Sequence, residues 1–364
     1  MVVFDLKFFT LVGCEVCCLC LVGVVVWALR LVTFRVRGRE RVGAYHDGVV
    51  VDLRAAYAAL LGESMSRTKA MRRAARLIPG DMVRFLSLGD MSLEAAESAL
   101  EYVGSKRIEG LTYDLNEVTL RAPVPRPGKI FALAGNYAEH FKEVGMVLPK
   151  KSRPRCFVKV SSIVIGPGEP ILLPRGMPPH GKNVHVDWEA ELAVVMGRRG
   201  KYIPKERAYE YVAGYTIMND VSARRTGWTR SYEVPDIERD KFFDWLIGKN
   251  LDTFAPMGPW LVTKDEISDP QNLNFTLKVN GVTRQDSNTR WMIYKIPEII
   301  EYLSTITTLY PGDVIATGTC SGIGWRPPDG KAGTYLKDGD VVEIEFEGIG
   351  ILRNPVKEEP PIEA

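Results

Sequence analysis

Apolar and acidic positions alternate in the stretch VDWEAELAVV, residues 186–195. With the two-residue period of a β-strand, Asp187, Glu189 and Glu191 fall on one face, and the larger apolar side chains fall mainly on the other. Carboxylates buried this close together repel one another and lose their hydration. They stay ionised only beside a cation or several hydrogen-bond donors. The pattern therefore predicts either an acidic interior site or a sheet face that is open to solvent.

The chain changes character at residues 121–128, RAPVPRPG, because three prolines prevent the continuation of a helix or a strand. Before this segment, the alternation and the glycine turns of residues 31–53 predict short strands and a hairpin. Ser92 is placed to act as the N-cap of a helix. Helical spacing predicts helices at residues 55–61, 67–77 and 93–102.

Strands and turns dominate the rest of the chain, and no helix–strand alternation of the βαβ kind is present in the sequence. Helices are predicted only at residues 205–211 and 296–303. The predicted fold class is α+β, mainly β. The predicted strands are residues 157–160, 163–165, 189–196, 273–279 and 341–346.

The first thirty residues are unusually apolar. From Phe8 to Leu29 the only charged side chain is Glu15, and the stretch is long enough to span a bilayer. Lys7 is offset by Asp5, and no signal-peptidase site is obvious. Three interpretations stay open: a membrane anchor, an atypical signal sequence, or an upstream extension outside the working protein. The predicted division is a leader at 1–30, a small N-terminal α+β domain at 31–120, a linker at 121–128, a large domain at 129–358 and a tail at 359–364.

Composition narrows the class of protein. Apolar residues make up 46% and charged residues 25% of the chain, as in soluble globular proteins. A net charge of +2 gives no reason to expect a nucleic-acid partner, and the basic stretch 67–77 is interpreted as a solvated helix face. Four of the six cysteines lie in the leader, so a disulfide framework is not expected. We expect a cytoplasmic protein, or a membrane-anchored one if the leader is genuine.

A third acid can join the two glutamates. Asp220 follows the apolar run YVAGYTIM, where a strand gives way to a loop. With Glu189 and Glu191 it supplies three carboxylates, and all-oxygen ligation suits magnesium or manganese better than zinc. In the alternative interpretation, the glutamates lie on a solvated face and Asp220 only caps a turn.

Several long motifs make the chain resemble the fumarylacetoacetate hydrolase family over residues 129–354, and its N-terminal part resembles the small domain of two-domain bacterial and archaeal members. The resemblance implies a mixed β-roll catalytic domain and a homodimer. The motifs are KIFALAGNYAEH, VDWEAELAVVMG, GYTIMNDVSAR, GKNLDTFAPMGPW, PGDVIATGTCSGIG and GDVVEIEFEGIGILRN.

The resemblance assigns roles to eight residues. His140 and Glu143 match a catalytic histidine–glutamate pair on a lid, and residues three apart share one face of a helical turn. Glu189, Glu191 and Asp220 match the metal ligands, for which Mg²⁺ is expected and Mn²⁺ or Ca²⁺ are alternatives. Arg224, Lys249 and Thr319 match substrate-binding residues, and Lys249 is also assigned to catalysis.

These residues fit one reaction. A 2-oxo acid offers oxygens to the cation, which acts as a Lewis acid, and Lys249 and Arg224 add positive charge where an enolate develops. His140 would take a proton from water, which then attacks the distal carbonyl of a 1,3-diketo acid. The expected function is therefore metal-dependent hydrolysis of a carbon–carbon bond in a fumarylacetoacetate- or acylpyruvate-like substrate.

One departure from the family pattern keeps other functions open. Gly227 stands where hydrolases of the family often carry a glutamine that places water or substrate. A reaction without water therefore gains weight: decarboxylation of a 2-oxo diacid such as oxaloacetate, or isomerisation of a 2-hydroxy-dienoate of the 2-hydroxyhepta-2,4-diene-1,7-dioate type. A non-catalytic metal- or acid-binding protein is a further alternative.

Overall fold

The computed structural model describes residues 29–104, 106–143, 153–175, 184–224, 237–325 and 333–360. The apolar leader before residue 29 and the departure at Gly227 lie outside these ranges. Among the helices within them, none is both long and apolar enough to cross a bilayer.

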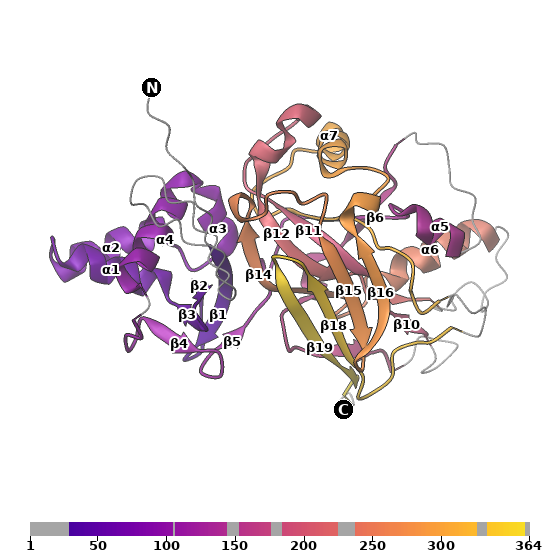
Figure 1. Ribbon diagram of the computed structural model, residues 1–364, viewed down its shortest axis with the longest axis horizontal. Coiled ribbons are helices and arrows are strands. Elements are labelled where there is room, and N and C mark those ends of the chain that lie inside the picture. Colours follow the sequence, from indigo (N-terminus) through magenta and orange to yellow (C-terminus); the bar gives the residue numbers. More distant parts are fainter. Residues whose placement is uncertain are drawn as a thin grey trace, which may run out of the picture.

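A large, mostly antiparallel sheet forms the centre of the molecule (Figure 1). Two short strands lie off its main path: β5 (Thr119–Leu120) pairs with β1, and β8 (Val164–Ile165) pairs with β14. The main path runs through β4 (Thr112–Asp114), β3 (Val49–Val51), β2 (Arg39–His46), β1 (Arg30–Val36), β14 (Ala255–Thr263), β12 (Val212–Asn219), β11 (Ala190–Met196), β17 (Val314–Ala316), β6 (Ile130–Leu133) and β7 (Cys156–Lys159).

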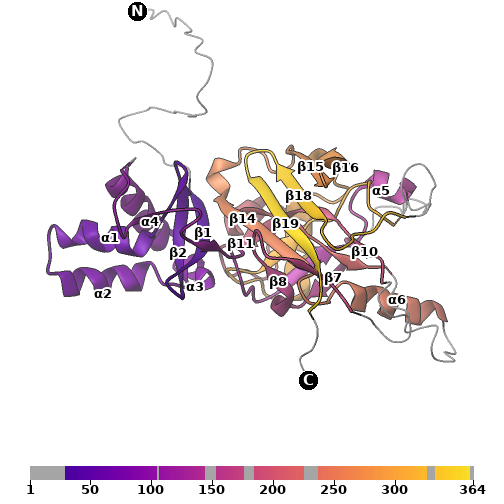
Figure 2. The same cartoon turned by 90° about the horizontal axis from the view of Figure 1, so that it is seen from below.

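A second sheet lies across the first. Its strands β18 (Val341–Phe346) and β19 (Gly350–Glu358) pack on β12 and β14 (Figures 1 and 2). Within the second sheet, Phe275 stacks on Phe346 at a centroid distance of 4.5 Å. A separate two-stranded ribbon joins β10 (Val186–Asp187) to β13 (Ser222–Ala223). The second sheet runs in the order β16 (Val282–Asn288), β15 (Asn274–Val279), β18 (Val341–Phe346), β19 (Gly350–Glu358) and β9 (Ile171–Leu173).

The central strand β11 is buried along its whole length. It pairs antiparallel with β12 on one side and with β17 on the other, and its register begins with Ala190 opposite Asn219. Since successive side chains of a strand point to opposite faces, burial of every residue means that both faces of β11 lie in the core. The acids at its start are therefore enclosed, and the interpretation of a solvated sheet face is wrong.

The N-terminal segment packs four helices beside its strands, at one end of the molecule (Figure 2). It does not form a separate sheet, because Arg30 and Leu31 of β1 pair with Val262 and Leu261 of β14. The predicted division at residues 121–128 stays a prediction, and strands from both sides of it share one sheet. The helices are α1 (Leu53–Gly62), α2 (Arg67–Leu77), α3 (Met82–Ser87) and α4 (Asp90–Val103).

One local expectation is wrong. Ser92 lies inside α4, which begins at Asp90, and its hydroxyl donates to the carbonyl of Leu77 rather than capping the helix. The strand expected at residues 163–165 corresponds to β8, which follows a 3₁₀ helix at residues 161–163. The helix expected at residues 205–211 is present as a 3₁₀ helix, and β12 begins immediately after it.

Three further helices lie on the large domain: α5 (Ala138–Glu143), α6 (Ile237–Gly248) and α7 (Ile296–Ile306). The expected helix at residues 296–303 corresponds to α7, with Pro297 in its first turn. The fold class predicted from the sequence, mixed and mainly β, is confirmed.

Candidate active site

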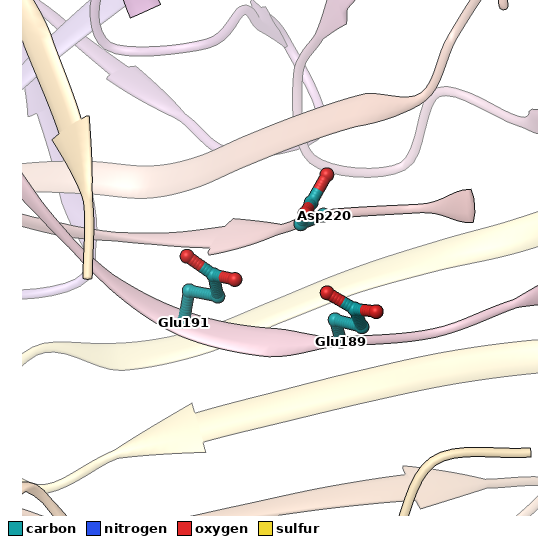
Figure 3. A group of neighbouring side chains, drawn as sticks. All are labelled: Glu189, Glu191 and Asp220. Atoms are coloured by element: carbon teal, nitrogen blue, oxygen red, sulfur yellow. The ribbon is translucent and has the colours of Figure 1, made fainter. Parts of the chain in front are cut away.

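Three acids meet at one end of the paired strands β11 and β12. Glu189 precedes β11, Glu191 lies within it, and Asp220 follows β12; the Asp220 amide donates to the Glu189 carbonyl at 2.9 Å. All three are buried, and each offers a carboxylate oxygen within 4.8 Å of the others (Figure 3). The structure thus brings together the three acids that the sequence analysis grouped.

Lys249 and Lys159 compensate part of this negative charge. The Lys249 ammonium group donates to Glu189 Oε2 at 2.8 Å and to Asp220 Oδ2 at 2.6 Å. Lys159, at the end of β7, donates to Asp220 Oδ1 at 2.5 Å, and its side chain is fully buried. Asp220 therefore lies between two ammonium groups.

Lys159 was missed in the sequence, although a signal for it existed. In β7, Phe157 and Lys159 are buried and Val158 is exposed. A lysine in phase with the inward phenylalanine of a strand is a candidate for an interior charge. The signal is weak, because a terminal lysine at a strand end is more often solvated.

Arg224 forms a second arm of the charged cluster. It donates from Nε to Asp187 Oδ2 at 2.8 Å and from Nη2 to Glu189 Oε1 at 2.5 Å. Asp187 also accepts the backbone amides of Gly324 and Trp325. The third acid of the alternating stretch is thus not part of the triad. It holds Arg224 against Glu189.

The surroundings separate the pKa values of the acids. Burial raises the pKa of Glu191 well above its usual value, and the neighbouring charges of Asp220 and Glu189 raise it further. Burial also acts to raise the pKa of Glu189, but Lys249 and Arg224 outweigh burial and hold it below its usual value. Glu191 is thus the acid whose charge is least compensated.

The cluster fits a divalent cation. Glu191 Oε2 accepts the Gly318 amide at 2.7 Å, whereas Oε1 is buried without a hydrogen-bond partner among the described residues. Four carboxylates face three cationic side chains, so the fully ionised cluster carries one net negative charge. Hard oxygen ligands and an uncompensated negative charge suit Mg²⁺, Mn²⁺ or Ca²⁺. The role of the three acids as ligands stays a prediction.

The chain after β17 runs back along β11 towards the acids. The Thr317 amide donates to the Leu192 carbonyl at 3.0 Å, and the next amide, of Gly318, donates to Glu191. Thr319 Oγ1 then accepts a 2.8 Å hydrogen bond from Gln285 Nε2. Thr319 is therefore held near the acids.

His140 and Glu143 lie on one face of α5, as their spacing predicted. His140 Nδ1 is 3.5 Å from Glu143 Oε2, and neither atom has a hydrogen-bond partner among the described residues. Glu143 Oε1 accepts the Gly322 amide at 2.9 Å, and the Gly322 carbonyl accepts the Trp188 indole N–H at 3.0 Å. A protonated His140 lowers the pKa of Glu189, so the imidazole lies within electrostatic range of the triad.

Comparisons with known proteins agree with this geometry. Residues 129–357 match the family model for the C-terminal domain of fumarylacetoacetate hydrolase. A mitochondrial oxaloacetate tautomerase from Bos taurus is 41% identical over 280 residues, which are 77% of this chain and 80% of that protein.

Two solved structures are similar over the whole of their chains and 91% of this one. A maleylpyruvate hydrolase from a Sphingobium species, in complex with manganese(II) and pyruvate, has a TM-score of 0.65 and 27% identity. A 5-carboxymethyl-2-hydroxymuconate delta-isomerase from Mycobacterium smegmatis has a TM-score of 0.62 and 30% identity. The chain therefore belongs to the fumarylacetoacetate hydrolase family of enzymes.

Proposed function

We propose that this enzyme interconverts the keto and enol forms of a 2-oxo dicarboxylic acid such as oxaloacetate. The observation that carries the proposal is the buried, unpartnered Oε1 of Glu191 within a triad of acids flanked by three cationic side chains. Such a site can bind a divalent cation at the acids, and the cation together with the cationic side chains can then bind an anionic substrate. The 41% identity to an oxaloacetate tautomerase supports this choice of substrate.

Glu189, Glu191 and Asp220 would hold a divalent cation, with Mg²⁺ expected and Mn²⁺ or Ca²⁺ as alternatives. When bound, this ion supplies Lewis-acid polarisation of the ketone oxygen of a 2-oxo acid. The manganese in the similar hydrolase structure supports a divalent ion in this fold.

Lys159 and Lys249 stabilise the enolate. Each ammonium group has three protons; Lys249 uses two of them on Glu189 and Asp220, and Lys159 bonds Asp220 and the Val221 carbonyl. One proton on each remains for a substrate oxygen. In a site without water, such fixed positive charge lowers the barrier by several kcal/mol.

His140 moves the proton. It takes a proton from C3 of the keto acid; the C–H electron pair becomes the C2=C3 bond, and the ketone oxygen gains the negative charge. The proton that His140 has taken up then passes to that oxygen and gives the enol, and the reverse steps regenerate the keto form. Glu143 Oε2, 3.5 Å from His140 Nδ1, orients the imidazole. No water enters the balance, in keeping with Gly227 at the position of the family's glutamine.

The experiment follows the ultraviolet absorbance of enol-oxaloacetate as it relaxes to equilibrium. We expect the enzyme with Mg²⁺ or Mn²⁺ to accelerate relaxation, and chelation of the ion or a His140→Ala substitution to abolish the acceleration. Relaxation at the rate of buffer with either ion would contradict the proposal. Release of carbon dioxide at the same rate would instead indicate decarboxylation.

Hydrolysis of a diketo acid is the second candidate, and the paired His140 and Glu143 favour it. The same imidazole can deprotonate water, whose oxygen then bonds to the distal carbonyl while the carbon–carbon bond breaks to give an enolate and a carboxylic acid. Formation of pyruvate from an acylpyruvate, with loss of the diketone absorbance, would support this reaction over tautomerisation.

We also propose a homodimer that uses an apolar surface on the large domain. Phe242, Phe243 and Ile247 of α6 are exposed, and Val158 of edge strand β7 is half exposed beside them. Asn250 joins these elements, because its Nδ2 donates to the Val158 carbonyl. Exposed apolar side chains gathered at a sheet edge mark an association surface.

The cellular location stays a prediction. The sequence favours the cytoplasm, whereas the bovine relative is named as mitochondrial. Fractionation of cells that express the full chain or a chain started at Leu31 would decide between cytoplasm, organelle and membrane.

A further inference from the structure

Gln285 is a buried amide on a strand whose other side chains are mostly solvent-exposed. In β16, Thr283, Arg284 and Asp286 are exposed, whereas Gln285 is only 1% exposed. It lies opposite Leu277 of β15 and reaches from the second sheet into the first. A fully buried amide costs stability unless its polar atoms are paired. Its partners therefore define its role.

The partners fix the orientation of the amide. Gln285 Oε1 accepts the backbone amide of Ala190 at 2.9 Å, and Nε2 lies 3.2 Å from the Cys320 carbonyl. A backbone N–H can only donate and a carbonyl can only accept, so exchanging the oxygen and nitrogen would break both contacts. The same Nε2 is 2.8 Å from Thr319 Oγ1 and must donate to it.

This bond determines what the Thr319 hydroxyl can do. Its oxygen is engaged as an acceptor, so its own proton is available for a second partner. No acceptor for that proton lies within the described part of the chain, and the side chain is nearly buried. Accepting one hydrogen bond strengthens the hydroxyl as a donor in the other. Thr319 therefore presents a donor, which suits an anionic oxygen.

The amide also sets the position of Thr319 relative to the acids. Ala190 lies between Glu189 and Glu191, beyond the stretch Ala193–Val195 with which β17 pairs. Here Gln285 Oε1 accepts the hydrogen bond of the Ala190 amide, as the backbone carbonyls of a neighbouring strand do for amides further along β11. One side chain thus connects the backbone between two acids to the hydroxyl of Thr319.

We propose that Gln285 is a positioning residue that holds the Thr319 hydroxyl as a hydrogen-bond donor to a carboxylate or enolate oxygen of the substrate. This inference rests on the proposed function, because it assumes a 2-oxo acid in the site. It adds a selection rule: at Thr319 the site favours an anionic oxygen over the carbonyl of a neutral ester or amide, because a hydrogen bond to a charged acceptor is stronger.

The decisive variant is Gln285→Glu. The carboxylate keeps an acceptor for Ala190 but presents an oxygen, not an N–H, to Thr319, so the hydroxyl turns its proton towards residue 285. A hydrogen bond to a charged group is worth enough that its loss weakens binding about 10- to 100-fold. We expect pyruvate binding, measured by calorimetry with Mn²⁺, to weaken by this factor. For oxaloacetate, KM should rise more than kcat falls.

Companion variants separate positioning from packing. Thr319→Val should weaken pyruvate binding similarly, Thr319→Ser should retain it, and Gln285→Glu should add little in the Thr319→Val background. Gln285→Met, which removes the amide at similar volume, decides the matter if the glutamate variant does not fold. The matched control is Asn354→Asp, because Asn354 is a buried amide that bonds the carbonyls of Gly166 and Glu169 in another part of the fold.

The outcomes are distinct. Three results together support the inference. Pyruvate binds more weakly to both Gln285 variants, and these variants no longer bind pyruvate more tightly than methyl pyruvate. Their losses of affinity also do not add to the loss caused by Thr319→Val. Wild-type affinity in Gln285→Met, additive losses, or an equal loss in Asn354→Asp overturns it. Absence of both pyruvate binding and oxaloacetate turnover in the wild type would instead overturn the proposed function.

Discussion

At the scale of single residues, the site is a balance of buried charges. Asp220 lies between the ammonium groups of Lys159 and Lys249, and Glu189 lies between Lys249 and Arg224. Glu191 has no cationic partner within salt-bridge distance among the described residues, and its Oε2 accepts a hydrogen bond from the backbone amide of Gly318. The uneven compensation explains why its pKa is raised while that of Glu189 is lowered.

The first prediction concerns Glu191→Gln. Burial raises the pKa of Glu191 above its usual 4.5, so in the metal-free protein the protonated form favours the fold. This contribution is present at acidic pH and is lost as the pH rises above 4.5. In EDTA the variant should therefore be more stable than wild type at pH 7, with a smaller difference at pH 5. Thermal unfolding at the two pH values measures this.

The same variant should lose its response to metal. A ligand that binds only the folded state raises Tm, so Mg²⁺ or Mn²⁺ should raise the Tm of wild type by several degrees and leave Glu191→Gln unchanged. Glu210→Gln, a substitution at an exposed glutamate, is the control and should respond as wild type does. A full metal response in Glu191→Gln would contradict the assignment of this acid.

A second prediction concerns Lys159→Met. The substitution keeps much of the buried volume and leaves Asp220 paired with Lys249. Because a positive charge is removed from beside the developing enolate, kcat for tautomerisation should fall roughly 10²- to 10³-fold. The steady-state rate with saturating Mg²⁺ measures this. Lys201→Met, a substitution at a surface lysine, is the control and should retain full activity. A Lys159→Met enzyme with wild-type kcat would show that Lys159 does not stabilise the enolate.

At the scale of elements, the segment from Thr317 to Trp325 lies alongside residues 187–192 and is held there by hydrogen bonds to both backbone and side-chain atoms. Thr317, Gly318, Gly322 and Gly324 bond Leu192, Glu191, Trp188 and Asp187 in turn, which is the reverse of the chain order of these partners. Between them, Thr319 bonds Gln285 of β16. The Gly322 amide also donates to Glu143 Oε1 of α5. The segment therefore connects the acids, the threonine and the histidine helix.

A third prediction compares two glycines with positive φ. At Gly322, φ is +97° and an added Cβ would lie 2.0 Å from the Arg284 carbonyl oxygen, whereas at Gly281 φ is +76° and nothing lies within 4 Å. Gly281→Ala should cost about 1 kcal/mol, from backbone strain alone. Gly322→Ala must also move the segment, so it should cost more stability and lower activity at least ~10-fold. Urea unfolding and the tautomerase rate test both, and equal stability losses would contradict the argument.

At the scale of the whole molecule, the two ends of the molecule differ in the chemical character of their exposed side chains. The basic helix α2 lies at one end, and the apolar surface of α6 and β7 lies at the other (Figures 1 and 2). A stable dimer buries roughly 1,200 Å² or more, with apolar anchors at its centre. The exposed phenylalanines of α6 are the candidates for these anchors.

The fourth prediction follows from that surface. Phe243→Asp places a charge among apolar side chains, and we expect it to weaken dimerisation at least ~30-fold. Light scattering across a dilution series should show a dimer for wild type and a monomer for the variant at micromolar concentration. Met71→Asp changes an equally exposed side chain on α2 and should leave the dimer intact. A monomeric wild type would contradict the expected homodimer.

The sequence by itself determined the features that depend on local spacing. Alternation located β11 and its acids, three-residue spacing joined His140 to Glu143, and ordered motifs identified the family. These features are readable because a strand or a helix imposes its period on neighbouring residues whatever surrounds it.

Only the tertiary structure decided which distant residues complete the site and the sheet. Lys159 and Gln285 lie in segments whose patterns match ordinary strands, and each joins the acidic cluster through a contact with a residue more than sixty positions away. The pairing of β1 with β14 likewise spans the predicted linker. Such contacts depend on how sheets pack and which buried polar atoms need partners, and local periodicity does not encode either.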